Sequence, residues 1–135
     1  MSLPIGLRRE VIRRAKGRCE YCRLSQIGQE ATFHIDHIQP IIEDGATDLQ
    51  NLALACVSCS LRKGARRDAR DPLSGTTALL FHPRQQSWSD HFRWKFNRIT
   101  GLTPTGRATI ELLKMNRSLA LAIRAEERLF HRHPP

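Results

Sequence analysis

The sequence has no run of about 18 apolar residues, the length at which a helix begins to span a bilayer. Residues 1–6 also contain no apolar run of signal-peptide length. We therefore expect a cytoplasmic protein that has no membrane partner. Disulfides rarely persist in the cytosol, so the four cysteines among the 135 residues need another explanation.

Acidic residues are scarce compared with basic ones. The chain has 13 Asp and Glu against 22 Lys and Arg, which leaves a formal net charge of +9. Such an excess favours a polyanionic partner, because Lys and Arg neutralise phosphates and release counterions. The charge therefore predicts DNA, or RNA, as the partner, with a generally basic soluble protein as the alternative. It argues against a scaffold that binds only other proteins.

The cysteines form two Cys-x-x-Cys pairs, Cys19 with Cys22 and Cys56 with Cys59, separated by 33 residues. A single pair would also be compatible with a thioredoxin-like redox motif. Two pairs without a strand–helix context favour a closed tetrahedral zinc site with four thiolates, which holds shape and does no chemistry. Zinc should add about 10 kcal/mol to folding, which matters for a chain whose residues are only 40% hydrophobic.

The segment between the pairs predicts two strands joined by a loop. Residues 31–38 favour a strand, and residues 52–55 favour a second, short one. Alternation along the first strand places His34 and Asp36 on one face and His37 on the other.

A helix over 58–67 follows, with Leu61 as its candidate for burial, and a helix over 7–17 precedes the first cysteine pair. The helix over 58–67 is strongly basic, and we expect it to contact nucleic-acid phosphates. The residues expected to make these contacts are Arg62, Lys63, Arg66 and Arg67.

Residues 71–135 have no metal-ligand or nucleophile spacing. Their patterns predict a short strand at 78–81, one strand at 92–99, and helices at 107–115 and 117–130. The expected fold class is therefore α+β. A small zinc-stabilised core with an N-terminal helix occupies residues 1–70, and a strand-plus-helices extension in residues 71–135 packs on it.

The central residues, taken in order, resemble the HNH endonucleases of the ββα-metal class. The resemblance covers about residues 15–67, and spacing, order and expected elements agree. It rests on Cys19-x-x-Cys22, Asp36-His37-Ile38-x-Pro40, Gly45, Asn51-Leu52 and Cys56-x-x-Cys59-x-x-x-Lys63. It implies a ββα-metal core with structural zinc, a separate catalytic Mg²⁺ or Mn²⁺, and hydrolysis of DNA phosphodiester bonds.

The resemblance also implies roles for single residues. His37 matches the general base that takes a proton from the attacking water, and Asp36 matches a carboxylate ligand of the catalytic ion. Asn51 matches the residue that ties the loop and holds the base histidine in orientation. The family has Asn or His directly after the last cysteine as a further metal ligand, and this sequence has Ser60.

Ser60 leaves two questions open. A hydroxyl is a poorer ligand than an amide or an imidazole, so Ser60 completes the metal site directly or through water, or His34 completes it from the strand face of Asp36. A structural His34, satisfied by a neighbouring group, is the alternative. The departure also admits a second function, a zinc-stabilised nucleic-acid-binding module with impaired catalysis, although binding alone would not need the Asp36–His37 pair.

Overall fold

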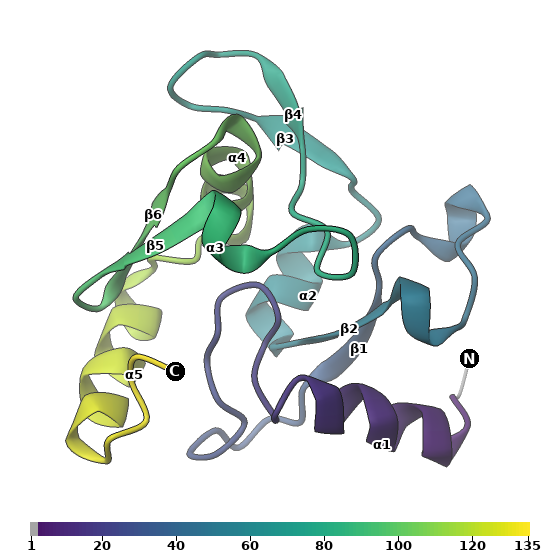
Figure 1. The fold of residues 1–135 in the computed structure, drawn as a ribbon, viewed down its shortest axis with the longest axis horizontal. Helices are drawn as coiled ribbons and strands as arrows, with labels where there is room; N and C mark the ends of the chain where they lie inside the picture. Colours follow the sequence, from purple (N-terminus) through teal and green to yellow (C-terminus); the bar gives the residue numbers. More distant parts are fainter. Residues whose placement is uncertain (1–2) are drawn as a thin grey trace.

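The computed structural model describes residues 3–135, which form helices and short antiparallel strand pairs (Figure 1). This arrangement confirms the predicted α+β class. Every helix within residues 3–135 is too short or too polar to cross a membrane. In chain order the elements are α1 (Ile5–Arg14), β1 (His34–His37), the 3-10 turns η1 (Ile41–Glu43) and η2 (Leu49–Asn51), β2 (Leu52–Ala55), α2 (Val57–Lys63), β3 (Asp68–Arg70), β4 (Thr77–Leu79), α3 (Trp88–His91), β5 (Phe92–Lys95), β6 (Arg98–Gly101), α4 (Pro104–Leu113) and α5 (Ser118–Leu129).

The hairpin of β1 and β2 is the centre of the first half of the chain. The strands pair antiparallel, with Ile35 opposite Leu54 and Asp36 opposite Ala53. All four residues of β2 are buried, because α1 packs against this strand and α2 packs against both strands (Figure 1). The second strand lies where the sequence predicts it, whereas the first is shorter than the predicted range of 31–38.

Helix α2 begins after Cys56 and ends at Lys63, earlier than the predicted 67. Gly64 follows at a φ of +52°, a left-handed conformation in which glycine avoids the steric cost of a Cβ. The predicted burial of Leu61 is wrong, because its side chain is 72% exposed. The inward positions of α2 are taken by Cys59 and Lys63 instead.

Beyond α2 the structure differs from the prediction in three places, of which the short helix α3 is one. Strand β3 has little signal in the sequence, because only Ala69 is buried between two charged residues. The single strand predicted at 92–99 is wrong, since the chain reverses after β5 and returns as β6. Phe96 occupies the reversal at a φ of +56°, a conformation that interrupts any strand.

Helix α4 packs on β3, β4, β6 and α2, and thereby joins the two halves (Figure 1). One hydrophobic cluster contains Val11 and Leu54 from the first half together with Phe92 and Leu113 from the second. The β3–β4 hairpin spans position 70, and the division into 1–70 and 71–135 stays a prediction.

Candidate active site

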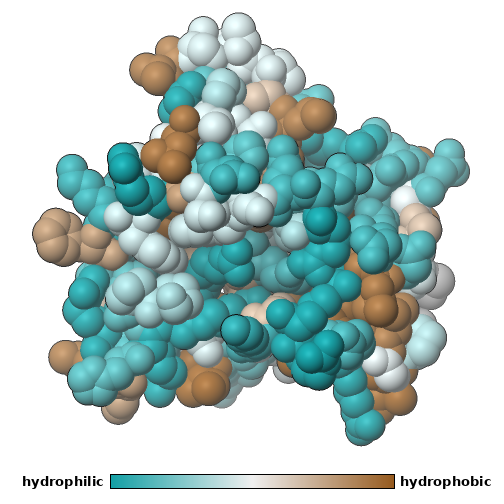
Figure 2. Space-filling view, in the orientation of Figure 1, coloured by the Kyte–Doolittle hydropathy of each residue, from teal (hydrophilic) through white to brown (hydrophobic). Residues whose placement is uncertain are grey.

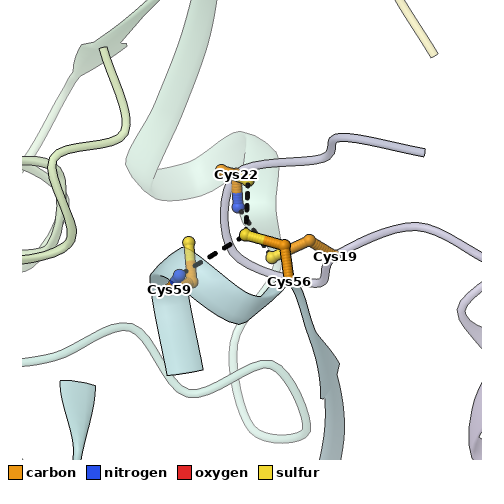
Figure 3. Close-up of side chains that lie close together, drawn as sticks. All are labelled: Cys19, Cys22, Cys56 and Cys59. Carbon is orange, nitrogen blue, oxygen red and sulfur yellow. Dashed lines mark hydrogen bonds between the residues drawn. The ribbon is translucent and has the colours of Figure 1, made fainter. Parts of the chain in front are cut away.

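The four cysteines converge at the junction of the hairpin and α2 (Figure 3). Cys19 and Cys22 lie in the loop after α1, Cys56 caps the N-terminus of α2, and Cys59 lies in its first turn. Their sulfur atoms all lie within 4.8 Å of one another and are buried. The Sγ atoms of Cys22 and Cys56 are 3.7 Å apart, close to the roughly 3.8 Å edge of a tetrahedron whose Zn–S bonds are about 2.3 Å long.

The donor set fits a zinc ion. The backbone N–H of Cys59 points at Cys56 Sγ at 3.4 Å, and that of Cys22 points at Cys19 Sγ at 3.5 Å. Such N–H groups stabilise thiolates. Burial raises the pKa of Cys19 well above its usual range, so the thiol needs a cation to ionise and zinc binding would release protons.

One face of β1 meets one face of α2. His34 and Asp36 point to the same side of the strand, as the alternation predicts, and Ser60 and Lys63 lie three residues apart on the helix. His34 Nδ1 lies 2.8 Å from Ser60 Oγ, and Lys63 Nζ lies 3.2 Å from Asp36 Oδ2. The structure therefore brings together His34 and Ser60, the two residues that the sequence offers as alternatives for completing a metal site.

Asp36 is held firmly from two sides. Tyr21 Oη donates to Asp36 Oδ2 at 2.8 Å, while Lys63 Nζ reaches Oδ1 at 3.4 Å and the carbonyl oxygens of His37 and Ile38 at 3.3 and 3.2 Å. Burial raises the pKa of Asp36, and the charge of Lys63 opposes that rise. Lys63 is only 2% exposed, so the expectation that it contacts phosphate from the surface is wrong: its ammonium group neutralises Asp36 instead.

His37 projects from the other face of β1. Its Nε2 lies 2.9 Å from Thr47 Oγ1, in the loop between the two strands. Asn51 closes that loop: its Oδ1 accepts from the backbone N–H of Gln39 at 2.8 Å, and its Nδ2 donates to Gln39 O at 3.0 Å and to Ala46 O at 2.9 Å. Asn51 thus fixes both ends of the loop that carries the partner of His37.

Gly45 is required by a close approach within the same loop. A Cβ at this position would lie 1.8 Å from the carbonyl oxygen of Gln39 and 2.8 Å from that of Pro40. Any larger residue would therefore push the loop away from β1, and Thr47 would move with it.

Two open cavities adjoin these residues. One, of about 400 Å³, is lined by Asp36, His37 and Ser60 and by the start of the loop after α2. The other, of about 720 Å³, is lined by Arg8, His34 and His37. His37 lines both, so this residue lies between the two cavities.

The donor set fits a hard divalent cation in the first cavity. Mg²⁺ in proteins often takes only one or two carboxylates and completes its shell with waters and phosphate oxygens. Asp36 offers one carboxylate, whose Oδ1 makes only the long contact to Lys63 and so keeps acceptor capacity. Ser60 offers a hydroxyl oxygen in the same cavity.

The other expected phosphate contacts are at the surface. Arg62, Arg66 and Arg67 are exposed on and after α2. Arg62 Nε donates to Ser58 Oγ at 3.2 Å, and Arg67 lies 3.8 Å from Glu43. These exposed contacts are weak, so the guanidinium groups remain available to a polyanion.

A β-hairpin followed by a helix, with four clustered thiols at the junction, defines a small α+β domain built around a metal site. Residues 19–66 match the family model described as HNH endonuclease, so this segment of the chain is similar to HNH domains. HNH domains are generally nucleases, so the match indicates a nuclease or nucleic-acid-binding function. No curated protein and no solved structure matches the chain significantly.

Two contributors to the site have little signal in the sequence. Tyr21 is the one tyrosine of the chain and lies between two metal-ligand cysteines, but nothing local says that it reaches Asp36. Thr47 lies in a polar loop without useful spacing. Lys63 did carry a signal, because a residue four positions after Cys59 on a helix shares its inward face.

Proposed function

We propose that this chain is a metal-dependent endonuclease that hydrolyses phosphodiester bonds of DNA and leaves a 5′ phosphate. The observation that carries the proposal is the cavity that Asp36, His37 and Ser60 line beside the loop closed by Asn51. A general base and a carboxylate beside an open volume of about 400 Å³ leave room for a phosphate and a water. The protein would act in the cytoplasm.

His37 is the general base of this proposal. A neutral imidazole can take the proton from an attacking water. The contact with Thr47 Oγ1 at 2.9 Å holds the ring, and Asn51 holds the loop that carries Thr47. This support keeps the ring oriented, and within residues 3–135 the second ring nitrogen makes no hydrogen bond.

Asp36 would bind Mg²⁺ or Mn²⁺. Ser60 would bind the same ion directly or through a water, and His34 would lie behind Ser60. Such an ion, when bound, stabilises the charge that develops on the phosphate and on the departing oxygen. His34 and Ser60 act together, because their 2.8 Å contact aims the Ser60 hydroxyl. Arg62, Arg66 and Arg67 would hold the DNA backbone without reading its sequence.

A second candidate is a nucleic-acid-binding module with impaired cleavage. One observation favours it: the ammonium group of Lys63 already neutralises Asp36, which lowers the attraction of that carboxylate for a second cation. Ser60 stands in place of a stronger ligand, which also lowers the affinity of the site for a second cation. In this case the domain would bind DNA and require no divalent ion beyond zinc.

A supercoiled-plasmid assay separates the two candidates. The zinc-loaded chain is incubated with plasmid and Mg²⁺ or Mn²⁺, and product ends are tested for ligation by DNA ligase. Nicking that yields ligatable 5′-phosphate ends supports the endonuclease. Retarded plasmid without nicks under every metal supports the binding module.

A further inference from the structure

A large cavity lies away from the candidate active site. It has a volume of about 830 Å³ and is formed where the loop after α1 faces the segment that leads into α3 and β5, with the C-terminal residues on one side. Among the described residues, it shares no lining side chain with the cavities beside His37. We call it the arginine–tryptophan groove, after Arg14, Arg18, Arg23, Arg84, Trp88 and Trp94.

The groove is strongly basic. Six of its lining residues are Arg or Lys, and Glu20 is the one acidic residue among them. Glu20 is already engaged, because it pairs with Arg84 and accepts from the backbone N–H of Leu54 at 2.8 Å. The face in Figure 2 that overlies this region is predominantly hydrophilic. Arg132 is paired with Glu127, so the net positive field of the groove comes from Arg14, Lys16, Arg18 and Arg23.

Arg14 is a second feature of the groove that would suit an anion. Its guanidinium donates to the carbonyl oxygen of Leu52, but its Nε is buried and makes no hydrogen bond within the described chain. Burial, together with the neighbouring charge of Arg14, lowers the pKa of Arg84 to about 10. A phosphate beside Arg14 and Arg84 would offset the repulsion between their charges.

The groove also carries a stacking surface. Trp88 and Trp94 lie with their ring centroids 5.2 Å apart, and the guanidinium of Arg23 lies 5.2 Å over the Trp88 ring. Both indoles are only half-buried. Trp88 is held in place because its Nε1 donates to Tyr21 O at 2.8 Å. Fixed indoles and a planar guanidinium are the groups on which unpaired bases stack.

We propose that the arginine–tryptophan groove binds a single-stranded segment of DNA, with its phosphates at Arg14 and Arg84 and its bases against Arg23, Trp88 and Trp94. Duplex DNA fits less well, because its bases are stacked on one another and cannot reach the indoles. The inference extends the proposed function by a second DNA contact, but binding in the groove does not require cleavage. An HNH site and a single-strand site in one chain would favour substrates in which paired and unpaired DNA meet.

The chain reports on this groove by its own fluorescence. It contains two tryptophans, and both line the groove. Titration of the full zinc-loaded chain with a dT12 oligonucleotide, without Mg²⁺ or Mn²⁺, should quench tryptophan emission to saturation. A 12-base-pair duplex should bind at least tenfold more weakly by the same signal. Absent quenching, or equal affinity for the duplex, overturns the inference.

Charge-reversal variants locate the binding. Arg23→Glu should weaken dT12 binding at least tenfold, and Lys16→Glu, an exposed groove residue, should weaken it at least threefold even if Arg23→Glu disturbs folding. The matched control is Arg93→Glu, because Arg93 is exposed on β5 outside the groove. An equal loss in Arg93→Glu, or no loss in Lys16→Glu, contradicts the assignment.

The two proposals fail separately. If dT12 quenches the fluorescence of a protein that never nicks plasmid, the endonuclease proposal is contradicted and the groove proposal stands. If the protein nicks plasmid but dT12 does not change its tryptophan fluorescence, the groove proposal is contradicted and the endonuclease proposal stands.

Discussion

Lys63 Nζ lies 3.2 Å from Asp36 Oδ2, and both side chains are buried. The pair joins α2 to β1, and Tyr21 joins the same carboxylate to the zinc loop. The carboxylate proposed to hold the catalytic ion is therefore fixed by the same elements that carry the cysteines. Zinc and the proposed catalytic site are coupled through this contact.

Removal of Lys63 should leave Asp36 as a buried, uncompensated charge. We expect Lys63→Met to lower the free energy of unfolding by about 3 kcal/mol, the usual cost of breaking a buried pair. The double variant with Asp36→Asn should lose less than the sum of the two single losses. Urea unfolding of the zinc-loaded chain measures this. Arg62→Met, an exposed neighbour, is the control and should change stability by less than about 0.5 kcal/mol; strict additivity would mean that the pair is not coupled.

Zinc should be required for the fold of residues 19–66. The chain should bind one zinc, and Cys59→Ala should lose it, because three thiolates leave the tetrahedral shell incomplete. A chelator should then unfold the wild type, since zinc contributes about 10 kcal/mol. Metal analysis and circular dichroism test this. Ser60→Ala, the next residue of α2, should retain zinc, and loss of zinc in that variant would contradict the assignment of the four thiols.

Asn51 should matter to both stability and activity. Asn51→Ala removes three hydrogen bonds to the loop, and we expect a loss of about 2 kcal/mol in unfolding free energy. Plasmid nicking should fall at least tenfold, because Thr47 no longer holds the His37 ring. Gln50→Ala, an exposed neighbour, serves as the control. Unchanged stability in Asn51→Ala would show that the loop is held by other contacts.

Much of this site could be predicted because its signals are local. The two cysteine pairs, the second strand and the opposite faces of His34 and His37 depend on spacing and alternation over a few residues. The spacing of the cysteines restricts the kind of site that they can form. The predicted cluster of four cysteines is accordingly confirmed.

The rest depends on contacts between distant segments. The basic character of 58–67 predicts phosphate contacts, and the helical spacing from Cys59 gives no sign that Lys63 pairs with Asp36, 27 residues earlier. The arginine–tryptophan groove unites α1, the zinc loop and the region of α3 and β5, which no sequence pattern connects. The break between β5 and β6 depends on one residue, Phe96, which adopts a left-handed conformation. An aromatic residue in the sequence does not predict that conformation.

The stability that the Asp71–Arg107 pair contributes should not change with pH near neutrality. Hydrogen bonds from Arg107 hold the pKa of Asp71 well below its usual range. Because the folded pKa lies below the unfolded value of about 3.9, the stabilisation is complete above that value and is lost as the pH falls through the folded pKa. Asp71→Asn should therefore lower the urea midpoint by the same amount at pH 6, 7 and 8. A loss that grows across this interval would point to another titrating group.

The role of His37 is the central claim, and single-turnover plasmid nicking with Mn²⁺ tests it most directly. The comparison is between the wild type and His37→Ala, with zinc content and circular dichroism matched. We predict a rate at least 100-fold lower in His37→Ala, because the general base is lost while Asp36 and the zinc cluster remain, in the range typical of such bases. Equal rates for the two proteins would contradict the account.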